Sequence, residues 1–355
     1  MKIIKRFKKG MFLAISAPKN IFFRRTSRPL YPEFMVFEIT SLCNSRCTHC
    51  SIWKHPGNIK EEITRKEIKK ALQDKVFKKL KFVLITGGEA LLKKDLKEII
   101  HDMNEIFPGI HIYLSTNGLL PDKAIDLIKF SKEKGINIGI GISLDALGEK
   151  HDLIRGVPGN FKKIEYLLKE LVKIREKYGC DMPIGLGFTL SKYTAKDYIA
   201  VKKYAEKFDV GFLSQTYNEA EYYKNDLKEK DKKIDSQGNE ELINVINQLP
   251  ASLLKKLSIK SLKGENMKFS CYALQKFFLL RPNGDVAPCL NWCNSTIGNI
   301  KYNSPSEVWK SKKAKEVRKK ILKCDGCLND WCTNKSFEAS FYPMIPYYLR
   351  KLIQK

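Results

Sequence analysis

The chain has 355 residues, 43% of them hydrophobic, which fits a soluble protein with one large domain and a smaller one. Its ten cysteines are too few for a disulfide scaffold, and their clustering favours metal binding in a reducing cytoplasm. The net charge of +26 indicates either an anionic partner (nucleic acid, a membrane surface or a phosphorylated substrate) or a Lys-rich solvated surface.

The N-terminal segment, residues 1–33, is strongly basic. Residues 1–30 hold nine Lys or Arg and no acidic residue, and Ile4, Phe7, Met11 and Ile15 recur at helical spacing. No stretch of the chain approaches the roughly 20 apolar residues of a membrane-spanning helix. The predicted amphipathic helix therefore either lies on an anionic membrane surface or caps the bottom of the domain that follows.

Three closely spaced cysteines follow the first predicted strand, residues 34–40. Cys43, Cys47 and Cys50 form a C-x3-C-x2-C pattern, and three thiolates on one loop can bind three irons of a four-iron cluster. The fourth iron then has no protein ligand, and a catalytic site needs such an open coordination position. A structural metal site, in contrast, has protein ligands at every position. A zinc loop or three unrelated thiols are the alternatives. His49 lies between the ligands, where it cannot easily complete a zinc tetrahedron.

Strands and helices alternate over residues 34–215. Strands are predicted at 34–40, 81–86, 110–116, 136–144, 183–190 and 210–215, and helices near 64–79, 92–107, 121–134, 160–178 and 194–208. This alternation predicts an α/β fold with parallel strands joined by right-handed crossovers. Six units are fewer than a closed eight-fold barrel contains, and periodicity alone leaves a doubly wound sheet open.

Glycines and polar residues stand at the C-terminal ends of these strands, where a barrel has its active site. They are Gly87, Gly88, Glu89, Ser115, Asn117, Ser143, Asp145, Thr189 and Gln215. Taken singly, a glycine pair is more often a turn, and Ser, Asn or Asp more often caps a helix. At successive strand ends they indicate one ligand site, which paired glycines allow a backbone to approach closely.

Residues 216–268 are rich in Lys, Glu, Asp and Asn. Their helical patterns predict an insert or bridge over the mouth of the domain, and a partly ordered charged linker is the alternative. At the far end, residues 336–355 form an aromatic and basic tail.

A second cysteine group lies in a smaller module, residues 269–335. The Asn283-Gly284 step predicts a hairpin, which brings Cys271 and Cys289 toward one end. Cys324 and Cys327 follow a predicted helix that runs from residue 306 to about 322. Four thiolates can hold either an iron–sulfur cluster or the zinc of a zinc ribbon.

The first cysteine loop, with the strand-end residues in this order, resembles the radical S-adenosylmethionine (SAM) enzymes. The resemblance implies a partial, six-unit TIM-type barrel. It implies that Cys43, Cys47 and Cys50 hold a 4Fe–4S cluster whose open iron takes the amino and carboxylate groups of SAM. An electron from that cluster then cleaves SAM to methionine and a 5′-deoxyadenosyl radical.

The resemblance also implies which residues position SAM. Gly87-Gly88-Glu89 is similar to the family's Gly-Gly-Glu-Pro motif, which receives the SAM amino group, although Ala90 replaces the proline. Ser143 and Asp145 then face the ribose and methionine, and Arg155 meets the carboxylate, which its planar fork matches. The same SAM site is expected to include His49, Ser115 and Asn117, with Thr189 and Gln215 on the adenine side.

The C-terminal module resembles the family's auxiliary-cluster extension, called SPASM when it carries seven cysteines and two clusters and twitch when it carries one. Six cysteines are present here, and a full SPASM pattern would need another near Ser336. The preferred interpretation is one auxiliary 4Fe–4S cluster held by Cys271, Cys289, Cys324 and Cys327. The roles of Cys293 and Cys332 stay open.

The resemblance implies an enzyme whose radical abstracts hydrogen from an unreactive C–H bond. The auxiliary cluster either takes an electron from the substrate or ligates it. The first option predicts an oxidoreductase or maturase that oxidises or cross-links a peptide or small molecule, with flavodoxin or ferredoxin as reductant. His151 and Tyr193 are acid–base candidates by position only, so no catalytic residue is assigned.

Two alternatives remain. In the first, the enzyme modifies a membrane-associated lipid or glycan. It would then be a cytoplasmic protein bound peripherally to the inner face of the membrane. Otherwise the chain is a zinc-ribbon nucleic-acid binder on a degenerate barrel, which lacks the clustered Arg and aromatic–basic pattern such binders use.

Overall fold

The structure is a computed structural model that describes residues 2–179, 182–191, 193–217, 220–224, 236–248, 253–265, 267, 269–324, 326–327, 330–341 and 345. Six parallel strands form most of one nine-stranded sheet: β1 (Phe34–Thr40), β2 (Phe82–Gly87), β3 (His111–Thr116), β4 (Ile138–Ser143), β5 (Ile184–Leu190) and β6 (Gly211–Thr216). The order β6-β5-β4-β3-β2-β1 keeps sequential strands adjacent, whereas a doubly wound sheet reverses its order. The predicted α/β fold with a partial barrel is confirmed.

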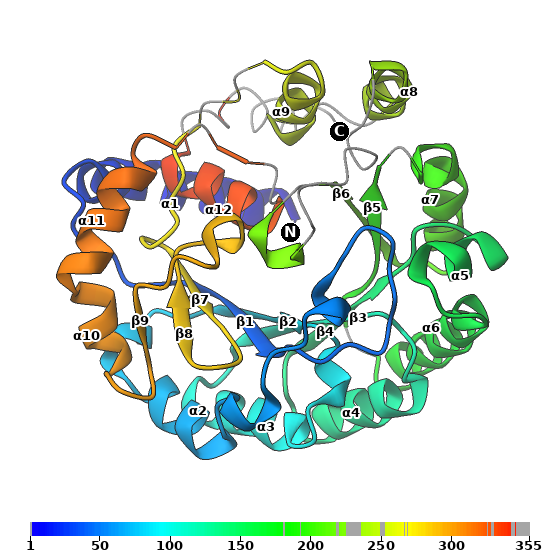
Figure 1. Cartoon of the computed structure of the whole chain (residues 1–355), viewed down its shortest axis with the longest axis horizontal. Coiled ribbons are helices and arrows are strands. Elements are labelled where there is room, and N and C mark those ends of the chain that lie inside the picture. Colours follow the sequence, from blue (N-terminus) through cyan, green and yellow to red (C-terminus); the bar gives the residue numbers. More distant parts are fainter. Residues whose placement is uncertain are drawn as a thin grey trace.

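Helices cover the outside of the curved sheet (Figure 1). They are α2 (Arg65–Leu72), α3 (Leu96–Ile106), α4 (Pro121–Glu133), α6 (Asn160–Lys177) and α7 (Tyr198–Lys207). A capping box between Thr64 and Glu67 starts α2. That helix ends earlier than predicted, because Asp74 caps a separate turn over residues 75–77. The short helix α5 (Glu149–Arg155) has no counterpart among the predicted helices.

Glycines on β4 admit an aromatic ring to the inside of the barrel. Gly139 and Gly141 alternate with isoleucines along this strand, and a Cβ added at Gly141 would lie 2.8 Å from the Tyr113 hydroxyl. Tyr113 belongs to β3 and is paired with Gly139, so its ring lies across the neighbouring strand. The small and apolar character of this stretch therefore has two causes, buried isoleucines and the space that Tyr113 needs.

The C-terminal module extends the same sheet. β7 (Phe277–Leu280) pairs in parallel with β1, and β8 (Asp285–Ala287) and β9 (Gly298–Asn299) follow antiparallel. The predicted hairpin forms, with Gly284 at φ +88°. Two helices, α10 (Pro305–Lys310) and α11 (Lys312–Ile321), replace the single predicted one, because the Ser311 side chain caps α11.

The N-terminal helix packs against the C-terminal module. α1 (Lys2–Arg25) runs alongside α12 (Asp330–Ser340) (Figure 1). Between the barrel and the module, α8 (Ser236–Asn247) contacts residues 195–197, and α9 (Leu253–Leu262) contacts α12. Most of the predicted tail lies outside the described residues. None of the described helices is long and apolar enough to cross a membrane.

Candidate active site

The first three cysteines converge on the loop after β1. Cys47 is buried, with Ser45 Oγ 3.1 Å from its Sγ, and the Ser45 N–H donates to Cys43 Sγ at 3.5 Å. Burial raises the pKa of Cys43 to about 11 and that of Cys50 to about 12, and the charge of Cys47 adds to both shifts. These thiols therefore need a cation, such as a metal centre, to be held as thiolates.

The glycine pair after β2 holds the cysteine loop in place. A Cβ at Gly87 would lie 2.3 Å from the Thr40 carbonyl oxygen, and one at Gly88 would lie 2.0 Å from that of Leu42. The Gly88 N–H donates to the Thr40 oxygen at 2.8 Å. In the structure, these glycines allow a close approach to the backbone that leads into the cysteine loop. The sequence pattern instead predicts a close approach to a ligand.

Glu89 joins the ends of β2 and β3. Its buried carboxylate accepts hydrogen bonds from Thr116 Oγ1 at 2.9 Å and from the Asn117 N–H at 2.7 Å. Burial raises the pKa of Glu89, although these hydrogen bonds oppose the shift. Asn117 Nδ2 donates in turn to Asn44 Oδ1 at 2.8 Å. Two predicted strand-end residues are therefore connected to the cysteine loop.

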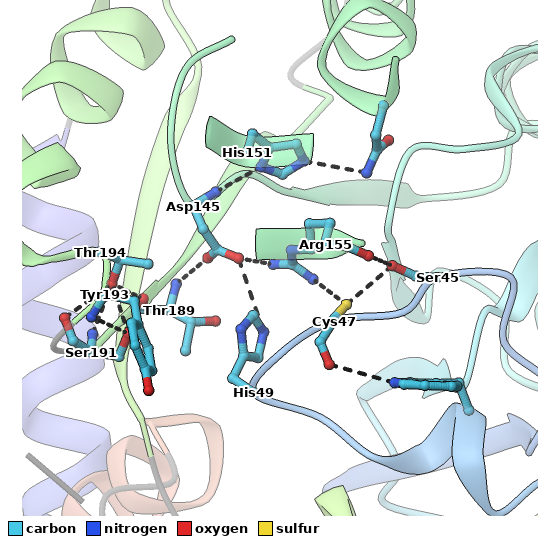
Figure 2. A network of polar contacts seen from close by, with 12 residues as sticks. Ser45, Cys47, His49, Asp145, His151, Arg155, Thr189, Ser191, Tyr193 and Thr194 are labelled. Atoms are coloured by element: carbon cyan, nitrogen blue, oxygen red, sulfur yellow. Dashed lines mark hydrogen bonds and ion pairs between the residues drawn. The ribbon is translucent and has the colours of Figure 1, made fainter. Parts of the chain in front are cut away.

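Figure 2 shows a buried carboxylate between the cysteine loop and the strands. Asp145 is fully buried, lies 2.7 Å from Arg155 Nη2, and accepts a hydrogen bond from the Thr189 N–H at 2.8 Å. His49 Nε2 is 3.9 Å from the same carboxylate, and Arg155 Nη1 donates to Cys47 Sγ at 3.7 Å. Burial opposes both charges, but their attraction outweighs it, so the pKa of Asp145 is lowered and that of Arg155 raised.

The second set of thiols converges in the C-terminal module. Burial raises the pKa of Cys271 to about 12, and the charges of Cys327 and Cys324 add to the shift. Burial also raises the pKa of Cys289, to which Cys271 and Cys327 contribute. These four residues are the ones that the sequence predicts as ligands of the auxiliary cluster.

Cys293 lies apart from this set. Burial raises the pKa of its thiol to about 11, and the charges that act most on it are those of Arg281 and Glu38. The Cys332 side chain lies outside the described residues. At the position where a second auxiliary cluster would need a cysteine, the buried Ser336 hydroxyl accepts a backbone hydrogen bond at 3.1 Å.

Thiol spacing distinguishes a cluster from a single zinc ion. Two sulfurs bound to one zinc, each at about 2.3 Å, are at most about 4.6 Å apart. Within the described part of the chain, His101, Asp102 and Glu105 form the only group of three or more His, Cys, Asp or Glu whose ligand atoms all lie within 4.8 Å of one another. In this structure, neither described thiol set has the spacing of ligands to one zinc ion. Cysteines of a four-iron cluster are farther apart, because each binds a different iron.

Two family models match the chain in the regions that contain these thiols. Residues 37–193 match the radical SAM superfamily, and residues 271–329 match SPASM, an iron–sulfur cluster-binding domain. The chain thus contains a radical SAM domain and a SPASM domain. Its cofactors are accordingly SAM, the SAM-binding 4Fe–4S cluster and an auxiliary iron–sulfur cluster, which the two thiol sets fit.

Similar proteins share parts of this architecture. The AdoMet-dependent heme synthase of Methanosarcina barkeri is 23% identical over 300 residues, 79% of this chain and 82% of that protein. The Fe-coproporphyrin III synthase of the same organism is 30% identical over 167 residues, 47% of this chain but 39% of that protein. The chain thus spans about two fifths of the second relative.

Solved structures show the fold. A structure of anSMEcpe with bound AdoMet (SAM) has a TM-score of 0.62 at 19% identity and covers 91% of this chain and 96% of that one. Streptococcus suis SuiB, bound to its precursor peptide SuiA, has a TM-score of 0.63 at 18% identity and covers 85% of this chain and 70% of that one.

The other predicted SAM-site residues lie at the same edge of the radical SAM barrel. Gln215 is paired with Thr189 across β5 and β6, and Ser143 is paired with Gly187. Ser115 is half-buried one residue before the end of β3. Their roles toward SAM stay predictions.

The sequence analysis missed residues that support the cysteine loop. Asn44 and Ser45 stand at variable positions of the cysteine motif, where the pattern gives no signal for them. Tyr222 lies beyond the barrel in the charged segment, yet its hydroxyl donates to the Gly87 oxygen at 2.9 Å. Such a contact between distant segments has no signal in a short window of sequence.

The two acid–base candidates differ in exposure. Tyr193 is 46% exposed, whereas His151 is fully buried. The Asp145 N–H donates to His151 Nδ1 at 3.2 Å, and the Asn160 amide lies 3.3 Å from Nε2. Burial lowers the pKa of His151 to about 4, and Arg155 adds to the shift. His151 is thus a neutral group within the network.

We expect the protein to lose stability as pH falls from about 6.5 toward 4. In this range the unfolded chain binds a proton at His151 that the folded chain excludes, so stability is complete above the unfolded pKa and decreases below it. A pKa lowered from 6.5 to about 4 corresponds to roughly 3 kcal/mol of unfolding free energy at most. Urea unfolding near pH 7 and near pH 5 should show a smaller loss in His151→Gln than in the wild type. Equal losses would contradict this assignment.

Proposed function

We propose that this protein is an oxidoreductase or maturase that removes a hydrogen atom from an unreactive C–H bond of a peptide or small molecule and releases an oxidised or cross-linked product. When bound, the first cluster and SAM supply the 5′-deoxyadenosyl radical. The observation that carries the proposal is the second set of four converging thiols. One auxiliary 4Fe–4S cluster there provides an acceptor for the electron that such an oxidation releases.

A buried carboxylate close to the cysteine loop can accept the proton that leaves the substrate. Glu38 on β1 and Arg281 after β7 form an ion pair at 3.2 Å. Glu38 is paired with Thr86 of β2 and lies two residues before the end of β1, the strand that leads into the cysteine loop. Glu38 Oε1 has no hydrogen-bond partner among the described residues, and burial raises the pKa of this carboxyl to about 7. We assign Glu38 as the candidate proton acceptor.

Glu38→Gln should separate radical formation from substrate oxidation. The amide keeps the size of the side chain but cannot accept a proton, so product formation should fall by roughly 100-fold or more. SAM cleavage, measured as 5′-deoxyadenosine, should continue. Glu61→Gln, a change at an exposed acid, is the matched control and should retain both reactions. Retention of product formation in Glu38→Gln would contradict the assignment.

Mass spectrometry of mixed substrates tests the proposed reaction. Reconstituted protein is incubated with SAM and dithionite, in one arm with peptide fractions and in the other with small-molecule fractions. A product that has lost two hydrogens, in proportion to 5′-deoxyadenosine, is the expected result. The peptide-bound SuiB structure and the Bacillus subtilis sporulation killing factor maturation protein, 24% identical over 168 residues, favour the peptide arm. A product without hydrogen loss would contradict the oxidation.

A membrane-associated lipid or glycan is the second candidate substrate, favoured by the basic helix α1. The zinc-ribbon nucleic-acid binder is disfavoured by the thiol spacing, and nucleic acid is not proposed as a partner.

We propose flavodoxin or ferredoxin as the reductant. We place the protein in the cytoplasm, because a reducing compartment keeps clustered cysteines available as metal ligands.

A further inference from the structure

One face of α1 is held by the C-terminal module. Ala17 and Asn20 are buried, and Asn20 Nδ2 donates to the Ala339 carbonyl oxygen of α12 at 3.0 Å. One turn later, Arg24 Nε donates to the carbonyl oxygen of Cys271 at 2.8 Å. Because residues three, four and seven apart lie on one side of a helix, these contacts define the inner face of α1.

The opposite face of α1 exposes large apolar side chains. Met11 is 53% exposed, Ile15 72% and Phe22 53%, and Phe12 beside them is 61% exposed. The spacing of four and then seven residues aligns Met11, Ile15 and Phe22 in one stripe, roughly 16 Å long at 1.5 Å per residue. Single exposed apolar residues are ordinary, but here four large ones are exposed on one helix. We call Met11, Phe12, Ile15 and Phe22 the outer stripe.

The charges around the outer stripe have one sign. The segment 1–30 has nine Lys or Arg and no acid, and Lys19, Arg25 and Arg28 are exposed. Among the described side chains, Lys19, Arg25 and Arg28 take part in none of the ion pairs, which involve Glu33 and later acids. These three cations are therefore available to an external anion, and like-charge repulsion opposes pairing of this face with a second copy of itself.

We propose that the outer stripe docks on an anionic lipid surface, with α1 parallel to the membrane plane. Apolar side chains then enter the interface while the flanking cations approach anionic headgroups, and both contacts favour binding. The inner-face contacts, including the one from Arg24 to Cys271, connect the docked helix to the auxiliary thiol site. This docking is independent of the substrate oxidation proposed above, because lipid binding requires neither cluster nor SAM.

Vesicle co-sedimentation of the full chain tests the docking. The probes are vesicles of phosphatidylcholine with and without phosphatidylglycerol, at low and high salt. We expect binding to the anionic vesicles only, weakened but not abolished by salt, because apolar contact is not screened. Phe12→Ser with Ile15→Ser should weaken it by about tenfold or more. Leu153→Ser with Tyr302→Ser removes two side chains elsewhere that are at least as exposed, and this variant should bind like the wild type.

Thermal melting keeps the test interpretable. The outer-stripe variant should melt like the wild type, because the replaced side chains are exposed, so lost binding would reflect the lipid contact. Wild-type protein that ignores anionic vesicles, or a stripe variant that binds as well as the wild type, would overturn the proposal. Binding that appears only after removal of residues 342–355 would also overturn it, because the chain's own tail would then occupy the stripe. Self-association that the stripe variant abolishes, without vesicle binding, would assign the face to a second copy.

Discussion

Anaerobically reconstituted wild-type protein should convert SAM to 5′-deoxyadenosine when dithionite supplies the electron, and Cys47→Ala should abolish this reaction. Cys47 is the buried member of the first thiol set, with Ser45 Oγ 3.1 Å and Arg155 Nη1 3.7 Å from its sulfur. Alanine would leave one iron of the cluster without its thiolate and Arg155 without its sulfur partner. Chromatography of the quenched reaction measures the product directly.

Cys293→Ala is the matched control for this experiment. It also removes a buried thiol, but one whose principal neighbours are Arg281 and Glu38. SAM cleavage should therefore persist in Cys293→Ala, with iron content and circular dichroism confirming that both variants are folded. Wild-type protein that yields no 5′-deoxyadenosine above a no-enzyme reaction would refute the radical SAM activity.

A triple alanine variant at Cys43, Cys47 and Cys50 should still bind about four irons per chain, the content of one four-iron cluster. The remaining cluster is expected at the thiols of Cys271, Cys289, Cys324 and Cys327, which converge independently of the first loop. Adding Cys289→Ala should remove most of this iron, and iron, sulfide and zinc assays on the same samples measure the change.

The other outcomes of that assay are equally definite. Zinc without iron in the triple variant would contradict the spacing argument and favour a zinc ribbon. Near eight irons in the triple variant would mean that Cys293 and Cys332 help to hold a second auxiliary cluster. Adding Cys293→Ala to the triple variant should leave the four irons in place.

Much of this protein could be predicted from short windows of sequence. The C-x3-C-x2-C spacing, the capping box of Thr64 and Glu67 and the Asn283-Gly284 turn each depend on neighbouring residues, so local chemistry determines them. The alternation of six strands with helices likewise implies parallel strands whose C-terminal ends share one edge. That edge holds Glu89, Asn117, Asp145 and Thr189, as the strand positions predict.

Only the tertiary structure decided which of these residues contact one another. Arg155 comes from the unpredicted helix α5 and pairs with Asp145. Glu38 forms an ion pair with Arg281 because β7 pairs with β1 at the edge of the barrel. The inner face of α1 packs against α12. Periodicity tells which side of an element is apolar but not what will cover it. Pairing of distant segments depends on strand register and on the burial summed over the whole sheet, and no short window contains either.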